Sequence, residues 1–147
     1  MMIRKANKED AETIANNNLL LAFESENISI EYKTVYNGVK NVIEDNTKGF
    51  YLVFEKNNKI IGQSMITYEW SDWNNMFIWW IQSVYVDKSY RKRGVFNNLI
   101  NHIKIMAKQN SIKILKLYVH KNNKNAKKVY ERIGMSKKSY DIFQIDL

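Results

Sequence analysis

The residues best suited to chemistry in this sequence form a short basic turn, Arg91-Lys92-Arg93-Gly94, between an apolar stretch and a helical pattern. The first turn of a helix has four backbone N–H groups without intrahelical partners, and the helix dipole adds partial positive charge there. Gly94 lacks a Cβ, so the backbone can turn tightly and approach a ligand closely. The turn therefore predicts a site for a phosphorylated ligand, with a solvated basic turn as the alternative interpretation.

Charge is unevenly distributed along the chain, which has a net charge of +8. From Arg91 onward there are 14 Lys and Arg against 3 Asp and Glu, a net charge of +11, whereas residues 1–90 have a net charge of −3. This asymmetry predicts a polyanionic ligand for the last third, either a phosphorylated small molecule or nucleic acid. Nucleic acid is the less favoured of the two, because no helix-turn-helix or RNA-binding signature is present.

Several classes of function are disfavoured by what the sequence lacks. Its 147 residues include no cysteine, which excludes disulfides, thiol nucleophiles and thiolate metal sites. His102 and His120 have no acidic partners at ligand spacing, so no metal is expected. The nucleotide motifs GxxxxGK[ST] and GxGxxG are both missing. No apolar run could span a bilayer and no signal-type segment begins the chain, so we expect a cytoplasmic protein without a membrane partner.

The elements that must position the basic turn can be read from the spacing of apolar residues. A short strand over 2–6 and two helices, over about 11–23 and 29–46, are predicted first. Two strands, 50–54 and 60–68, are joined by a polar turn and predict a hairpin.

The stretch from Met76 to Val86 is apolar on both alternations, which predicts a central strand covered by helices on both faces. A helix from Gly94 to Asn110 follows, with apolar residues on one stripe. A strand over 114–119, a helix from Asn123 or Asn125 to Ile133, and an extended segment over 135–147 complete the pattern. The predicted fold is a single α/β domain over residues 1–147, with a mixed sheet, a 49–86 antiparallel meander and the order β-α-α-β-β-β-α-β-α-β.

Two motifs lie within this framework. The apolar strand 84–86 is followed by Arg91-x-x-Gly94-x-Phe96, and residues 123–135 read N-x-x-A-x-x-x-Y-E-R-x-G-M. In this order the motifs resemble those of the GNAT superfamily of acyl-CoA-dependent N-acetyltransferases, and the element order agrees over nearly the whole chain. Phe96 departs from the family pattern, which usually has a small residue there. Its ring could pack into the core while its N–H still faces the phosphates.

The resemblance implies roles for particular residues. It implies that the Asn123 side chain hydrogen-bonds the cofactor near its sulfur, although Asn123 alone also predicts a helix N-cap. Tyr130 would protonate the leaving thiolate as general acid, the alternative being an aromatic residue that only packs on the sheet. Two backbone segments would bind the rest of coenzyme A: the pantetheine arm and thioester carbonyl at Val84, Tyr85 and Val86, and the pyrophosphate at the amides of Arg91, Lys92, Arg93, Gly94, Val95 and Phe96.

The general base is less clear from the sequence. Many members of the family have a glutamate four residues before the position of Val84, where this chain has Trp80. Glu69 is the nearest carboxylate that could face the cleft, and Asp72 is the second. A chain of water molecules to solvent is a further alternative.

The function implied is the transfer of an acetyl group from acetyl-CoA to a primary amine of a small molecule or peptide, in a ternary complex of a monomer or homodimer. A catalytically silent acyl-CoA binder, suggested by Trp80, and a basic nucleic-acid-binding module are the alternatives. The acceptor is expected on the acidic and aromatic side of the molecule. Carboxylates and aromatic faces there would favour an amine with an apolar or aromatic part. The residues expected on that side are Glu24, Glu26, Glu31, Glu69, Trp70, Asp72 and Trp73, together with Trp79 or Trp80.

Overall fold

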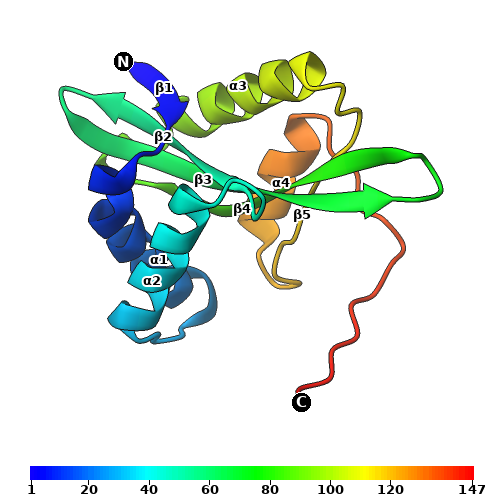
Figure 1. Cartoon of the computed structure of the whole chain (residues 1–147), viewed down its shortest axis with the longest axis horizontal. Helices are drawn as coiled ribbons and strands as arrows, with labels where there is room; N and C mark the ends of the chain where they lie inside the picture. The colour runs from blue at the N-terminus through cyan, green and yellow to red at the C-terminus, as the bar shows by residue number, and fades with distance from the viewer.

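The computed structural model describes all 147 residues and is built around a five-stranded sheet in the order β1-β2-β3-β4-β5 (Figure 1). Strands β1 to β4 are antiparallel, whereas β4 and β5 are parallel and α3 crosses between them, as the sequence predicts. The strands are β1 (Met2–Lys5), β2 (Phe50–Lys56), β3 (Lys59–Ser71), β4 (Met76–Val86) and β5 (Leu115–Leu117). The helices are α1 (Ala11–Glu26), α2 (Tyr32–Glu44), α3 (Val95–Gln109) and α4 (Lys124–Arg132), with short 3₁₀ turns η1 (Lys8–Asp10) and η2 (Lys88–Tyr90).

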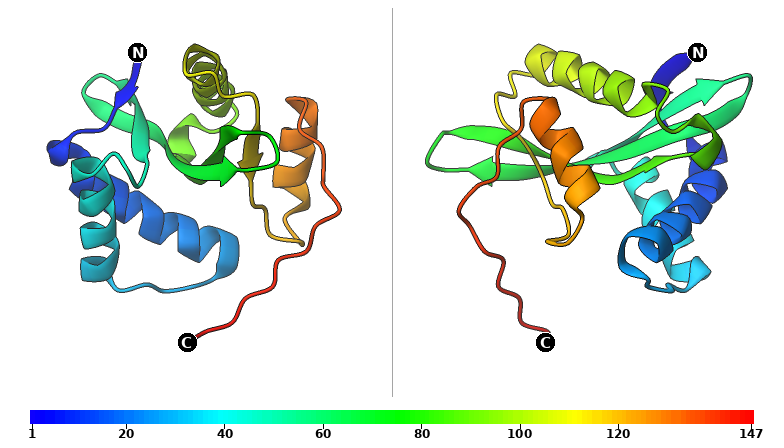
Figure 2. Two further views of the ribbon diagram at one scale, coloured as in Figure 1. Left: turned by 45° about the vertical axis from the view of Figure 1, so that its right-hand side comes forward. Right: turned by 180° about the vertical axis from the view of Figure 1, so that it is seen from behind.

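Helices cover both faces of the sheet, with α1 and α2 on one face and α3 on the other (Figure 2). The alternation of β2 shows the division: Phe50 and Leu52 belong to the core on the α3 side, and Tyr51 and Val53 pack with α1 and α2. Residues of β2 and β4 are buried on both alternations, which explains why these strands read as continuous apolar runs.

Helix α3 lies close to the sheet at Gly62 of β3. A Cβ built on Gly62 would come within 2.7 Å of Val95 Cγ1 and 3.2 Å of Leu99 Cδ1. Val95 and Leu99 are buried in the first turns of α3 and share a core cluster with Phe54 and Ile61. The missing side chain at Gly62 therefore sets where the N-terminus of α3, and the basic turn before it, can lie.

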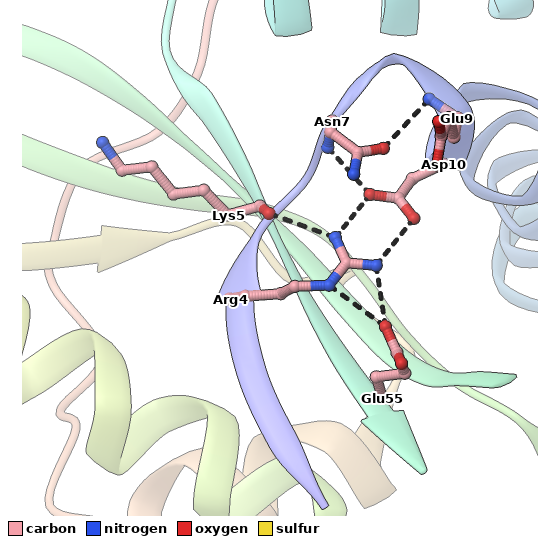
Figure 3. A network of polar contacts seen from close by, with 6 residues as sticks. All are labelled: Arg4, Lys5, Asn7, Glu9, Asp10 and Glu55. Carbon is pink, nitrogen blue, oxygen red and sulfur yellow. Dashed lines mark hydrogen bonds and ion pairs between the residues drawn. The ribbon is translucent and has the colours of Figure 1, made fainter. Parts of the chain in front are cut away.

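The first strand is joined to its neighbours by a partly buried ion-pair network (Figure 3). The Arg4 guanidinium donates to Asp10 at 2.7 and 3.0 Å and to Glu55 Oε2 at 2.8 and 3.0 Å. Asp10 Oδ2 also accepts the N–H of Asn7, whose side chain accepts from Glu9 N. The network thus fixes β1, β2 and the start of α1 against one another.

Several segments differ from the sequence prediction, and β3 is longer than expected, ending at Ser71 rather than Tyr68. Helix α2 begins at Tyr32 rather than Ser29, and β5 covers only Leu115–Leu117 of the expected 114–119. The extended segment over 135–147 pairs with no strand, so the final strand of the predicted order is wrong for this structure. Strand β5 is short because β4 bends away from it after Ile81, as the site geometry shows.

Candidate active site

A β-bulge in the central strand opens the sheet between β4 and β5. Gln63 of β3 pairs with Tyr85 and Met65 pairs with Gln82, so two residues of β4, Ser83 and Val84, face Ser64 alone. Ser83 has a φ of 50°, in the left-handed region. Such a bulge bends its strand. The last residue pair between β4 and β5 is Ile81 with Leu117. Beyond this pair the two strands form no backbone hydrogen bonds with each other.

A polar network beneath the bulge fixes α1 to the sheet. The fully buried Gln63 donates to Asn18 Oδ1 at 2.9 Å and accepts from Asn17 Nδ2 at 2.9 Å. Asn18 Nδ2 donates to the Tyr51 hydroxyl at 3.1 Å. Burial raises the pKa of Tyr51 and outweighs the hydrogen bonds to Asn18 and Ser83, which act in the opposite direction. The network therefore holds the floor of the opening in one arrangement.

Two cavities occupy this opening and meet at its centre. The larger, of about 520 Å³, lies between the α1–α2 region and the diverging ends of β4 and β5. The smaller, of about 280 Å³, continues along Val84, Tyr85 and Val86 toward Arg91. Both are lined by Val84, Asn123 and Tyr130, so these three predicted site residues come together from β4 and α4. The remaining lining residues of the larger cavity are Asn18, Leu21, Ala22, Ser25, Glu26, Ile30, Val35, Ile81, Gln82, Ser83, Leu117, Tyr118, Val119 and His120.

The basic turn lies at the outer end of the smaller cavity. Lys92 and Gly94 have φ values of 59° and 81°, and no side chain caps the N-terminus of α3. The first α3 N–H with a helical partner is that of Asn98, which donates to Gly94 O at 3.0 Å. The exposed start of α3 therefore keeps the unpaired N–H groups that an anion requires.

Arg91 has a different position from the other basic residues of the turn. Its guanidinium donates to Val86 O at 2.9 Å and to Glu24 Oε2 at 2.6 Å, and its backbone N–H bonds Lys88 O. Burial alone would raise the pKa of Glu24, but the hydrogen bonds from Arg91 and Lys88 lower it. Arg91 thus joins α1 to the end of β4, whereas Lys92 and Arg93 are exposed cations without a carboxylate partner.

Side chains of α4 and α3 meet at the junction of the two cavities. Asn123 Oδ1 accepts from Ala126 N at 3.1 Å, so the predicted N-cap is present. The amide Nδ2 of Asn123 has no protein partner. Because the N-cap hydrogen bond uses only Oδ1, Nδ2 is free to donate to a ligand. The Tyr130 ring packs on Phe96, with centroids 5.8 Å apart, and burial raises the pKa of its hydroxyl.

Most residues expected on the acceptor side lie elsewhere. Of that set only Glu26 lines the larger cavity, and Glu24 lines the smaller one. Trp79 is buried in the core, and Trp80 stacks on Tyr118 with ring centroids 4.3 Å apart. Glu31, the N-cap of α2, lines neither cavity. Strands β3 and β4 run past the end of the sheet, so the end of β3 and the connecting turn carry the other four residues away from the cavities. These are Glu69, whose carboxylate accepts from Lys116 Nζ at 3.0 Å, and Trp70, Asp72 and Trp73.

Sequence reasoning missed several residues that line or support the larger cavity. Asn17 and Asn18 interrupt the apolar pattern of α1, which is a signal that this helix carries a polar contact. His120 follows a strand on the ligand side of a parallel pair, and its Nδ1 accepts from Asn122 N at 3.2 Å. The bulge at Ser83 has no signal in the sequence. No cluster of three or more acidic, histidine or cysteine side chains that could hold a metal is present, and none of the helices could cross a bilayer.

Comparison with known proteins identifies the arrangement. The family model described as "Acetyltransferase (GNAT) family" matches residues 15–135. The chain belongs to the GNAT acetyltransferase family. Among solved structures, a possible acetyltransferase from Clostridium difficile 630 is 42% identical, with a TM-score of 0.93 and coverage of 99% of this chain and 97% of that chain. The fold class and the membership predicted from the two motifs are therefore confirmed.

More distant acetyltransferase structures share the fold. A predicted acetyltransferase from Clostridium acetobutylicum, solved with acetyl-CoA, is 18% identical, has a TM-score of 0.80 and covers 98% of this chain and 95% of its own. A ribosomal-protein-alanine N-acetyltransferase from Brucella melitensis biovar Abortus 2308 is 16% identical, with a TM-score of 0.76 and full coverage of both chains. No curated protein matches this chain.

Proposed function

We propose that this GNAT protein transfers an acetyl group from acetyl-CoA directly to a primary amine that enters from the larger cavity. One observation carries the proposal: two cavities meet at Val84, Asn123 and Tyr130, between the bulged strand and α4. A donor in the smaller cavity and an acceptor in the larger one would face each other there. Direct transfer needs this geometry, because both reactants must be held together.

The smaller cavity and the basic turn beside it fit coenzyme A, although Arg91 is the one residue of that turn that lines the cavity. The uncapped N-terminus of α3 and the exposed Lys92 and Arg93 suit the pyrophosphate. The edge of β4 over Val84, Tyr85 and Val86 has no strand partner, and apart from the Val86 carbonyl, which Arg91 bonds, its backbone groups can pair with an extended pantetheine arm that has two amides. Acetyl-CoA supplies the activated acyl group, and no metal is required.

Tyr130 is the proposed general acid. Its hydroxyl is protonated at neutral pH, since the ordinary pKa of tyrosine is about 10 and burial raises the pKa of Tyr130 further, so it can give a proton to the departing thiolate. The N–H groups around the bulge would stabilise negative charge that develops on the acyl oxygen. Asn123 Nδ2 is proposed to donate to coenzyme A near its sulfur.

The acceptor amine must lose a proton before it attacks. Glu69 is a proposed base from the sequence, but its ion pair with Lys116 and its place outside both cavities favour the water route to solvent. Glu26 would attract the ammonium group, and Leu21, Ile30 and Val35 offer an apolar wall. These features support a small-molecule or peptide amine with an apolar part.

A screen for CoA release tests the proposal. Because the chain contains no cysteine, a thiol reagent reports released CoA without background from the protein. Acetyl-CoA is incubated with the protein and a library of amines, with reactions lacking amine as controls for hydrolysis. Acetylation of at least one apolar amine, confirmed by mass spectrometry, is the expected result. If acetyl-CoA stabilises the protein against thermal unfolding but no amine causes CoA to be released, the protein is instead a silent acyl-CoA binder.

A further inference from the structure

Ser83, in the bulge of β4, has an unfavourable backbone conformation. Its φ of 50° lies in the left-handed region, which a residue with a Cβ adopts only at a cost. Ser83 and Val84 together face Ser64 of β3, and both line the larger cavity. A strained residue keeps its conformation only where its surroundings hold it, so the contacts beside the bulge must compensate for the strain.

A chain of hydrogen bonds reaches Ser83 from the neighbouring elements. The Gln63 amide of β3 donates to Asn18 Oδ1 at 2.9 Å, and Asn18 Nδ2 of α1 donates to the Tyr51 hydroxyl at 3.1 Å. The Tyr51 hydroxyl of β2 also forms a hydrogen bond with the Ser83 side chain. Tyr51 therefore connects the polar network to the bulge.

The direction of this chain is fixed at Gln63, which is fully buried. Because Gln63 Oε1 accepts from Asn17 Nδ2 at 2.9 Å, its Nε2 faces Asn18. Asn18 can offer only its oxygen to that donor, which turns its NH₂ group toward Tyr51. No buried side-chain nitrogen or oxygen lacks a partner, and a fully satisfied buried network holds one arrangement.

The position of Tyr51 separates it from the reacting groups. It is 4% exposed and lines neither cavity, so it touches no substrate. Its effect can reach the site only through the backbone of β4, where a bulge redirects the strand. The N–H groups around this bulge are the proposed donors to the acyl oxygen, and such donors act only when they point to where charge develops.

We propose that Tyr51 is a positioning residue, whose hydroxyl holds Ser83 in the left-handed conformation and so directs the N–H groups of the bulge toward the acyl oxygen of acetyl-CoA. The inference rests on the proposed acetyl transfer, in which Tyr51 is neither acid nor base. Loss of its hydroxyl should slow the transfer step without weakening the binding of coenzyme A.

Tyr51→Phe removes the hydroxyl alone and tests the proposal. We expect kcat to fall about tenfold while the KM for acetyl-CoA and the Kd of CoA change by less than about twofold, because the loss is confined to the transition state. Tyr68→Phe is the matched control, since Tyr68 of β3 lines neither cavity and packs on Phe50 and Phe77. Its kcat should equal that of the wild type. Circular dichroism checks that both variants fold.

Ser83→Gly supplies a rescue that a merely structural role would not produce. Glycine adopts a positive φ freely, so the bulge of this variant does not need the Tyr51 hydroxyl. In the Ser83→Gly background, Tyr51→Phe is expected to lower kcat by no more than about twofold, against about tenfold in the wild-type background. An equal fall in both backgrounds would overturn the proposal, since Tyr51 would then act on something other than the conformation of residue 83.

Backbone chemical shifts of Ser83 report its conformation without any acceptor amine. They are expected to be those of a left-handed residue in the wild type and to move toward extended values in Tyr51→Phe. A Ser83 that stays left-handed in Tyr51→Phe would overturn the proposal, and so would an unchanged kcat. Failure of the proposed function is distinguishable, because the wild type would then acetylate no amine while the Ser83 shifts still decide whether Tyr51 holds the bulge.

Discussion

The ring of Phe96 packs against the ring of Tyr130, with centroids 5.8 Å apart and planes inclined at 52°. Phe96 lies in the first turn of α3, where the phosphate site is proposed, and Tyr130 lies on α4 at the junction of the cavities. The bulky residue that departs from the family motif therefore orients the proposed general acid. Its backbone N–H is unaffected by this packing.

Tyr130→Phe is expected to lower kcat by about 100-fold or more while CoA affinity is retained, because only the proton donor is removed. CoA release and calorimetric titration of CoA give the two quantities. Tyr118→Phe is the matched control, since Tyr118 lines the larger cavity but stacks on Trp80. Equal turnover in wild type and Tyr130→Phe would remove Tyr130 from the mechanism.

Phe96→Ala should lower kcat, because Tyr130 loses the ring against which it packs. The half-buried ring also contributes about 1–2 kcal/mol of stability, measurable by urea unfolding. CoA affinity should be nearly unchanged, since alanine keeps the N–H at this position. Loss of CoA affinity with normal kcat would show that Phe96 serves the phosphate site instead.

Glu26 and Glu69 can be compared directly through glutamine variants. Glu26→Gln is expected to raise the KM for a cationic amine about two- to fivefold, as the loss of one exposed charge attraction predicts. Glu69→Gln should change neither kcat nor KM, because Glu69 lies outside both cavities and pairs with Lys116. A large fall in kcat for Glu69→Gln alone would restore this residue as the base.

Gly62→Ala is expected to displace the N-terminus of α3, because a Cβ there would meet Val95 Cγ1 at 2.7 Å. Overpacking of this kind costs about 1–3 kcal/mol, and CoA affinity should fall with it. Gly38→Ala in α2 is the control, since a Cβ at Gly38 has no neighbour within 4 Å and alanine favours a helix. Unfolding curves of both variants give the change in stability, and CoA titrations give the change in affinity.

Asp10→Asn is expected to cost about 2 kcal/mol of stability at pH 7, because Arg4 loses two charge-assisted hydrogen bonds. Burial alone would raise the pKa of Asp10, but the bonds from Arg4 and the Asn7 N–H lower it. The stabilisation is therefore present above the unfolded-state pKa of about 4 and is lost as the pH falls through the folded-state pKa. Unfolding of both proteins from pH 7 to pH 2 should show the difference shrink. Glu9→Gln is the control variant, since the Glu9 side chain is exposed and makes no contact in this network.

The periodicity of apolar residues was sufficient to predict the order of elements, the central strand and the parallel pair, because these depend on which faces are buried. The two motifs identified the turn before α3 and the residues Asn123 and Tyr130. The bulge at Ser83 could not be predicted, since one extra residue leaves an apolar pattern of this kind unbroken.

The acceptor side was harder to predict for a related reason. The residues from Glu69 to Trp73 were expected beside the cleft because they precede the central strand in sequence. How far β3 and β4 extend beyond their neighbours depends on register, which composition does not encode. Asn17 and Asn18 were readable as polar positions in a helix, but their partners Gln63 and Tyr51 lie on distant strands.

The gap between β4 and β5 makes the sheet incomplete until something extended fills it. A ligand that binds there stabilises the native state alone, and a concentration of 100 times its Kd adds about 2.7 kcal/mol. Degradation of the protein in a cell proceeds through its unfolded fraction, so its lifetime would rise and fall with the supply of that ligand. A ligand that fills the open sheet would thereby couple the amount of surviving enzyme to the supply of that ligand in the cell.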